Sequence, residues 1–367
     1  SEMCIRDRHS IGMTANPIVI TQTELTPRQQ KILGLIVQAY INTATPVSSK
    51  LIQEMGDLGV SSATIRNEMA TLEALGYLTH PHTSAGRMPT DKGYRYFVEK
   101  LIGDVELPQA ERNMIRHQFH QAKLEMSQWM QLAAAILARS ARSAALVTAP
   151  KLENPRLRHL ELISTQSQLV LLVVVFQGGT VRQRYITVKE PITQSTLSQV
   201  AAKFNSAGHN LDTASLKTKL TDLSEFEQDV LNVLLELAAE ADDLPLNEIY
   251  RDGLSEVLQE PEFISRDEAN TLVSAFEQPA FLNKVVNAPV GTIQVVIGGE
   301  GHWRELSACS MVLARYGVEG FATGALGVLG PTRMPYGRAI GTVRYVANLM
   351  SDLVSELYVD DPPSADD

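Results

Sequence analysis

The chain of 367 residues has only two cysteines, Cys4 and Cys309, which are too few for a disulfide framework or a cysteine-ligated zinc site. It also lacks long hydrophobic stretches, because its longest apolar run, Leu169–Phe176, is far shorter than the ~20 residues that cross a bilayer. No charged-then-apolar leader with a small-residue cleavage site stands near the N-terminus. These absences predict a cytoplasmic protein without membrane spans.

Common catalytic motifs are missing too, since the sequence contains no GxSxG, HExxH or GxGxxG. Cys309 has no obvious base beside it, and His80 and His82 have no third metal ligand of suitable type nearby. The segment Gly327–Met334 lacks the spacing of a phosphate-binding loop, which favours a tight strand-to-helix turn. We therefore expect no enzyme, no metal and no cofactor.

Positive charge is scarce: the chain has 32 Lys and Arg side chains but 42 Asp and Glu side chains, which gives a net charge of −10. That balance argues against indiscriminate binding to nucleic acids or membranes. The charge is unevenly spread: residues 1–103 hold ten basic and nine acidic side chains, and the remainder holds 22 and 33. A nucleic-acid site in the near-neutral first part would depend on base contacts more than on net charge.

The first hundred residues show the pattern of three helices, a short hairpin and a fourth helix. Capping residues, a proline at a first helical position and apolar side chains at 3–4 spacing mark the helices. The predicted elements are helices from Thr26, from Ser48 or Ser49 to Met55 and from Ser61 to about Leu75, strands at Tyr77–His80 and Arg87–Pro89, and a helix from Thr90. This order is typical of a winged helix-turn-helix.

The third helix has a face suited to DNA. Its apolar stripe holds Ile65, Met69 and Leu72, with Gly76 in line beyond the helix end. The remaining positions carry short or hydrogen-bonding side chains that allow close approach to a groove. The candidate DNA-binding residues on this helix are Ser61, Ser62, Ala63, Thr64, Arg66, Asn67 and Thr71. Arg and Asn pair with guanine and adenine edges, and a helix N-terminus favours phosphate oxygens. The plainer alternative is a helix of a small bundle.

The hairpin loop adds further candidates, His82, Thr83, Ser84 and Arg87, on a donor-rich segment suited to sugar–phosphate or minor-groove contacts. Arg87, Lys92 and Arg95 give this region three basic side chains against one acid, Asp91.

The rest of the chain alternates between helix and strand patterns, which predicts an α+β multidomain protein. The expected elements are a long helix at about Ala110–Ala145, strands at His159–Ser164, Leu169–Phe176 and Thr180–Val188, a helical block to about residue 277, strands at Thr292–Ile297, Leu306–Leu313 and Gly324–Leu329, and a helix at Tyr336–Tyr358. A sheet that is interrupted and then resumed favours one domain with an insertion over two domains in series. Leu169–Phe176 is predicted to be a central strand that is buried on both faces.

The predicted division is a disordered leader at 1–24, a winged helix at 25–103, a discontinuous domain at 104–190 and 278–358, an inserted domain at 191–277, and an acidic disordered tail at 359–367. Residues 1–12 resemble translated adapter sequence, which makes Met13 a candidate start; a natural frayed tail is the alternative.

Three segments resemble the HrcA family of heat-inducible transcription repressors: LTPRQQKILGLIVQAYINTATPVSSKLI, GVSSATIRNEMATLEALGYLTHPHTSAGRMPTDKGYRYFV and GVLGPTRMPYGRAI. The resemblance implies a homodimer that binds an inverted-repeat DNA operator upstream of chaperone genes and depends on chaperonin for activity. It also implies a winged helix, a GAF-like domain and an inserted dimerising domain. The family's DNA-binding positions fall on Ser62, Ala63, Thr64, Arg66 and Asn67, and on the loop His82–Arg87.

Two other functions stay open at this stage. One is a winged-helix regulator gated by a small molecule in the GAF-like domain, although fold alone does not establish a ligand. The other is a winged helix that serves only protein contacts.

Overall fold

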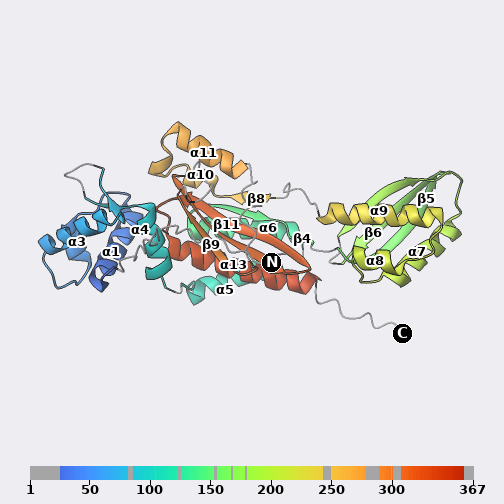
Figure 1. Cartoon of the computed structure of the whole chain (residues 1–367), viewed down its shortest axis with the longest axis horizontal. Helices are drawn as coiled ribbons and strands as arrows, with labels where there is room; N and C mark the ends of the chain where they lie inside the picture. Colours follow the sequence, from blue (N-terminus) through green and yellow to red (C-terminus); the bar gives the residue numbers. More distant parts are fainter. Residues whose placement is uncertain are drawn as a thin grey trace, which may run out of the picture.

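The computed structural model describes residues 25–81, 86–103, 105–122, 125–152, 155–166, 168–177, 180–242, 249–277, 289–298, 300 and 307–358. These residues form three lobes along the long axis of the molecule (Figure 1). The winged helix lies at one end, a large sheet with its helices occupies the middle, and a small sheet with three helices lies at the other end. We refer to the second and third of these as the central lobe and the distal lobe.

The winged helix has the predicted element order. Its elements are α1 (Pro27–Thr43), α2 (Ser49–Met55), α3 (Ser62–Ala74), β1 (Leu78–Thr79), β2 (Met88–Pro89) and α4 (Asp91–Tyr96), which continues as the π-helix η1 (Phe97–Leu101). Thr26 begins α1 with a capping box completed by Gln29, and Ser48, Ser61 and Thr90 cap the next three helices through their hydroxyl groups. The predicted helix starts are therefore confirmed.

The central lobe is built on an antiparallel sheet of order β8-β3-β11-β10-β9, with β4 paired to β11. Its strands are β3 (Ala144–Thr148), β4 (Lys151–Leu152), β8 (Ile249–Asp252), β9 (Ile293–Ile297), β10 (Cys309–Val318) and β11 (Ala322–Pro331). Helices α6 (Met126–Ala141) and α13 (Tyr336–Tyr358) pack on the sheet, and α5 (Gln109–Gln121) packs on α6. A second apolar cluster joins the sheet to α10 (Leu254–Val257), η2 (Pro261–Phe263) and α11 (Arg266–Glu277).

The prediction of one helix over Ala110–Ala145 is wrong. Helices α5 and α6 are separate, and Ala144 and Ala145 already belong to β3. Arg142, which follows α6, has a left-handed backbone with φ of 50°, and this conformation ends the helix. The alanine-rich sequence around it gave no sign of the boundary, since alanine favours continued helix.

The distal lobe contains the three strands β5 (Leu157–Gln166), β6 (Leu169–Phe176) and β7 (Val181–Thr187), which pair in that order. Its helices are α7 (Gln194–Gly208), α8 (Thr213–Lys219) and α9 (Glu225–Asp242), of which α7 packs on β5 and α9 on β7. The chain leaves the central sheet after β4 and returns to it at β8.

This topology differs from the predicted boundaries of the inserted domain, which the sequence pattern places at 191–277. The sequence pattern places β5–β7, within 104–190, in the discontinuous domain, but these strands form a separate sheet that supports α7 and α9. The predicted inserted block at 191–277 is itself divided, because β8, α10 and α11 pack in the central lobe. Strand patterns show that a segment is extended but not which partner it pairs with.

The prediction for Leu169–Phe176 is half right. As β6 it is the central strand of its sheet, yet burial alternates along it: Val170, Leu172, Val174 and Phe176 are buried, and the other four side chains are half-exposed. The strands buried on both faces are β3, in which all five residues are buried, and β11, in which all ten are buried. Gly324 in β11 leaves room for Tyr316, whose ring would lie 2.5 Å from an added Cβ.

Candidate nucleic-acid interface

Helix α3 has the two faces that its sequence predicts. Ile65, Met69 and Leu72 are buried against the winged-helix core. Six other positions of the helix point to solvent: Ala63, Arg66, Asn67, Ala70, Thr71 and Ala74 are exposed. Within the described part of the chain, neither Arg66 nor Asn67 has an ion pair or side-chain hydrogen bond. Their donors are therefore free to reach base edges in a major groove.

The hydroxyl-bearing candidates on α3 also have local roles. Ser61 caps the helix by accepting from the backbone N–H of Thr64 at 3.3 Å, and its hydroxyl lies 3.1 Å from the Thr64 hydroxyl. Thr71 donates to the carbonyl of Asn67 at 3.2 Å. Ser62, the first residue of the helix, is half-buried. Because Ser61, Thr64 and Thr71 are hydrogen-bonded within the helix, Arg66 and Asn67 are the stronger candidates for base contacts.

The hairpin of β1 and β2, which we call the wing, is fastened to the recognition helix α3. Arg87 Nε lies 2.7 Å from Glu73 Oε2, and the other oxygen of Glu73 contacts Nδ1 of His80. The backbone of Arg87 pairs with Val47 in both directions at 2.8 Å. The neighbouring Gly86 has no room for a side chain, because an added Cβ would lie 2.5 Å from the Val47 carbonyl oxygen. His82, Thr83 and Ser84 lie outside the described residues.

The other basic residues near the wing are engaged by groups of the protein itself. Lys92 donates to the carbonyl of Leu75 at 2.7 Å, at the end of α3, and lies over the Tyr77 ring. Arg95 pairs with Glu300 of the central lobe. The sequence does not reveal the roles of Glu73 and Glu300, because an acidic side chain carries no signal that identifies its partner in the tertiary fold. Arg66 is left as the exposed cation of the recognition helix.

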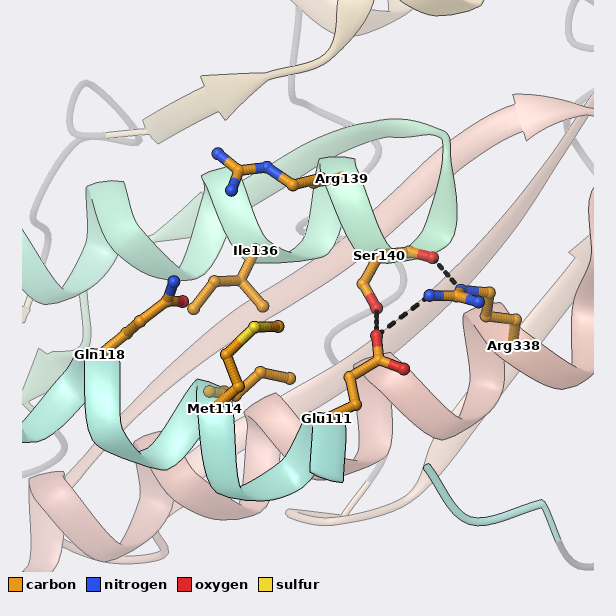
Figure 2. Close-up of a pocket in the computed structure, with 8 residues that line it drawn as sticks. Glu111, Met114, Gln118, Ile136, Arg139, Ser140 and Arg338 are labelled. Carbon is orange, nitrogen blue, oxygen red and sulfur yellow. Dashed lines mark hydrogen bonds and ion pairs between the residues drawn. The ribbon is translucent and has the colours of Figure 1, made fainter. Parts of the chain in front are cut away.

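A cavity of about 150 Å³ lies elsewhere, between α5, α6 and the start of α13. Figure 2 shows Glu111 between Ser140 and Arg338: Ser140 donates to its carboxylate, and Arg338 Nη2 donates to the same oxygen at 3.1 Å. Met114, Ile115 and Ile136 provide the apolar part of the wall.

No group of three or more His, Cys, Asp or Glu side chains among the described residues could hold a metal ion. Burial raises the pKa of the Cys309 thiol to about 12, which suppresses its nucleophilic form. None of the helices described in the structure combines the length and apolar character needed to span a bilayer.

A recognition helix with a small-residue face, set between a capped helix pair and a hairpin, defines a winged helix-turn-helix DNA-binding protein. A family model described as the HrcA DNA-binding winged helix-turn-helix transcription repressor matches residues 24–101, and one described as the HrcA protein C terminal domain matches residues 127–340. The chain belongs to the HrcA family.

Known relatives agree with this assignment over nearly the whole chain. The heat-inducible transcription repressor HrcA of Chloroflexus aurantiacus is 42% identical over 353 residues, which cover 91% of this chain and 95% of the relative. The repressor of the same description from Herpetosiphon aurantiacus is 43% identical, covering 91% and 97%. A crystal structure described as that of a hypothetical protein shares the fold, with a TM-score of 0.56, 23% identity and coverage of 91% and 98%.

Proposed function

We propose that this protein is a cytoplasmic, heat-inducible transcription repressor that binds an inverted-repeat DNA operator of chaperone genes as a homodimer. The observation that carries the proposal is the exposed, small-residue face of α3, from which Arg66 and Asn67 extend unpaired within the described residues. Short side chains let the helix enter a major groove, and these two donors can read a guanine and an adenine. Ser62, Ala63, Thr64 and the wing loop with His82, Thr83, Ser84 and Arg87 complete the proposed DNA surface.

The distal lobe offers a surface for the second copy. The outer face of its sheet carries Ile163, Leu171 and Tyr185 in one row across the three strands, and Val175 and Val181 in another. Tyr185 is 57% exposed and Val181 is 54% exposed, while α7 and α9 pack on the same sheet. Rows of exposed apolar side chains such as these, here separated by Glu161, Val173 and Gln183, are typical of an interface. We therefore assign dimerisation to the distal lobe and the GAF-like role to the central lobe.

The same face supports a role for chaperonin. A monomer exposes the apolar rows of β5, β6 and β7 before a partner covers them, and exposed apolar strands are prone to aggregation. A chaperonin that binds such a surface would keep the chain available for dimerisation. Repressor activity would then follow the amount of free chaperonin.

The cavity gives little support to a small-molecule switch. Its volume of about 150 Å³ is below the ~300–1,000 Å³ of typical ligand pockets, and Arg338 is already paired with Glu111. The winged helix, whose Arg66 is unpaired among the described residues, favours DNA over a purely protein-binding role.

Operator binding is tested by selecting duplexes from a random-sequence pool with the full chain and measuring their affinity. We expect the selected duplexes to contain an inverted repeat and to bind one dimer each. We also expect more DNA-binding activity to be retained when chaperonin is present during refolding. Enrichment of no sequence over random DNA would contradict the proposal. A parallel thermal-shift screen of metabolites tests the alternative, which requires a ligand that changes DNA affinity.

A further inference from the structure

Two arginines join the winged helix to the central lobe, one from each side. Arg95 lies on α4 of the winged helix. Its Nε donates to Glu300 Oε1 at 3.0 Å, and its Nη2 donates to the other carboxylate oxygen of Glu300 and to the carbonyl of Val295 at 2.9 Å. Arg333, in the turn between β11 and α13, donates to the carbonyl of Ile41 at 3.3 Å, in the last turn of α1. Each lobe therefore supplies one arginine to the other.

Both arginines are themselves held in place. Glu300 also accepts a hydrogen bond from the backbone N–H of Ile297 at 3.1 Å, which fixes its carboxylate at the end of β9. Arg333 is only 13% exposed and donates to Glu262 at 2.6 Å and also to Glu260. Planar arginine–carboxylate pairs fix orientation as well as distance. The C-terminal carbonyls of α1 also favour a cation at the position of Arg333.

Between the two arginines the lobes are in close contact. The rings of Tyr94 on α4 and Tyr336 on α13 lie 5.8 Å apart, and both residues are buried. Asp91, at the start of α4, lies so close to Gly298 that a Cβ added there would be 2.6 Å from its carboxylate oxygen. Rotation of the winged helix would separate these paired groups and expose the tyrosines. The junction therefore fixes the orientation of the winged helix.

We propose that Arg95 and Arg333 are positioning residues for operator binding. They set the orientation of each winged helix, and hence the distance and angle between the two recognition helices of a dimer. This inference rests on the proposed function, because a fixed geometry matters only where two winged helices bind two half-sites on one duplex. Arg95 and Arg333 act through the central lobe, since their guanidinium groups are engaged by Glu300 and by Glu260 and Glu262.

The expected effect of losing these contacts is selective. Each winged helix would still fold and bind a single half-site, because the recognition helix and the wing are unchanged. The second recognition helix would sample many orientations, which lowers its effective concentration at the second half-site. Preference for one spacing between half-sites would weaken for the same reason.

The test uses full-length Arg95→Gln, Glu300→Gln, Arg333→Gln and the Arg95→Gln/Arg333→Gln double variant. A matched control is Arg184→Gln, which removes an arginine that pairs with two glutamates, Glu236 and Glu240, within the distal lobe. Affinity is measured on duplexes with one half-site, with two half-sites at the spacing selected by the wild type, and with two half-sites displaced by one or two base pairs. Sedimentation verifies that each variant is still a dimer.

We expect the double variant to lose about tenfold or more on the paired half-sites, to keep its single-site affinity, and to bind the displaced pairs almost as well as the selected one. The control should match the wild type. Should Arg333→Gln fail to fold, Arg95→Gln and Glu300→Gln provide the same measurement. Equal losses on single and paired sites, or an unchanged spacing preference, would overturn the inference. A wild type without preference for paired sites would instead contradict the proposed function.

Discussion

Arg87 of the wing and Glu73 of the recognition helix form an ion pair, with 2.7 Å between Nε and Oε2 and side chains that are 22% and 24% exposed. The sequence alone predicts Arg87 as a contact for DNA phosphates. In the structure its guanidinium faces a carboxylate, and that carboxylate also contacts His80. The wing therefore depends on Glu73 for its position beside α3, and under the proposed function Arg87 would contribute to DNA binding at least through this position.

Arg87→Ala is expected to lower the free energy of unfolding of the winged helix by about 1–3 kcal/mol, because it leaves the largely buried Glu73 carboxylate without its guanidinium partner. It should also weaken binding to operator and random DNA alike, since a cation is lost and the wing is released. Denaturant unfolding and fluorescence anisotropy measure the two effects. Arg87→Lys, which keeps the charge, should recover part of the stability and part of the DNA affinity. Weaker DNA binding with unchanged stability would assign Arg87 directly to phosphate.

Arg66→Ala is expected to cost about 1–3 kcal/mol of operator affinity and to relax the preference at one base pair, because in the proposed function its exposed guanidinium reads a guanine edge. Competition assays with operators substituted at each position identify that pair. Arg116→Ala, at an exposed position on α5, is the matched control and should leave DNA binding unchanged. Equal losses on operator and random DNA would remove Arg66 from base readout.

The winged helix could be predicted almost residue by residue because its signals are local. Thr26, Ser48, Ser61 and Thr90 act within three residues of the helices they cap, and the apolar stripe of α3 repeats within one helix. The contacts of Arg87 and Arg95 could not be predicted in the same way. Their partners, Glu73 and Glu300, are brought close only by the tertiary fold.

Hydrophobicity alone does not predict the burial of the strands in this protein. The continuous apolar run of β6 suggested burial on both faces, but its sheet is covered by helices from the same chain on one face. Strand β11 contains Gly324, Gly327 and Gly330 and is buried throughout, because the glycines admit neighbouring side chains such as Tyr316. The half-exposed apolar residues of β6 are not buried within the monomer, and they are therefore available for the proposed interface.

Tyr185→Glu should convert the proposed dimer to monomer, because it places a charge in the apolar rows of the distal sheet. Stability of the monomer should change little, since Tyr185 is 57% exposed. Analytical ultracentrifugation measures the association, and operator affinity should fall with it. Ile264→Glu is the control, because Ile264 is 81% exposed in the central lobe and should leave the dimer intact. A dimer that persists in Tyr185→Glu would place the interface elsewhere.

The raised pKa of Asp91 should make the stability of the junction between the winged helix and the central lobe depend on pH. Burial, with the nearby Glu300 carboxylate, raises the pKa of Asp91 above its ordinary value of 3.8. The folded state therefore binds this proton more tightly than the unfolded state does. The contribution of Asp91 to stability is greatest below its ordinary pKa and is lost as the pH rises through the raised value. Asp91→Asn, which cannot ionise, should accordingly be more stable than the wild type at pH 7.

The stability gain of Asp91→Asn should shrink as the pH falls toward 4, because protonation of the wild-type carboxyl removes the same unfavourable charge. Thermal unfolding of both proteins between pH 4 and pH 7.5 gives the comparison. Asp57→Asn, at an exposed position in the winged helix, controls for the general loss of a negative charge. A gain that stays constant across this pH range would show that Asp91 acts through packing against Gly298 and not through its ionisation.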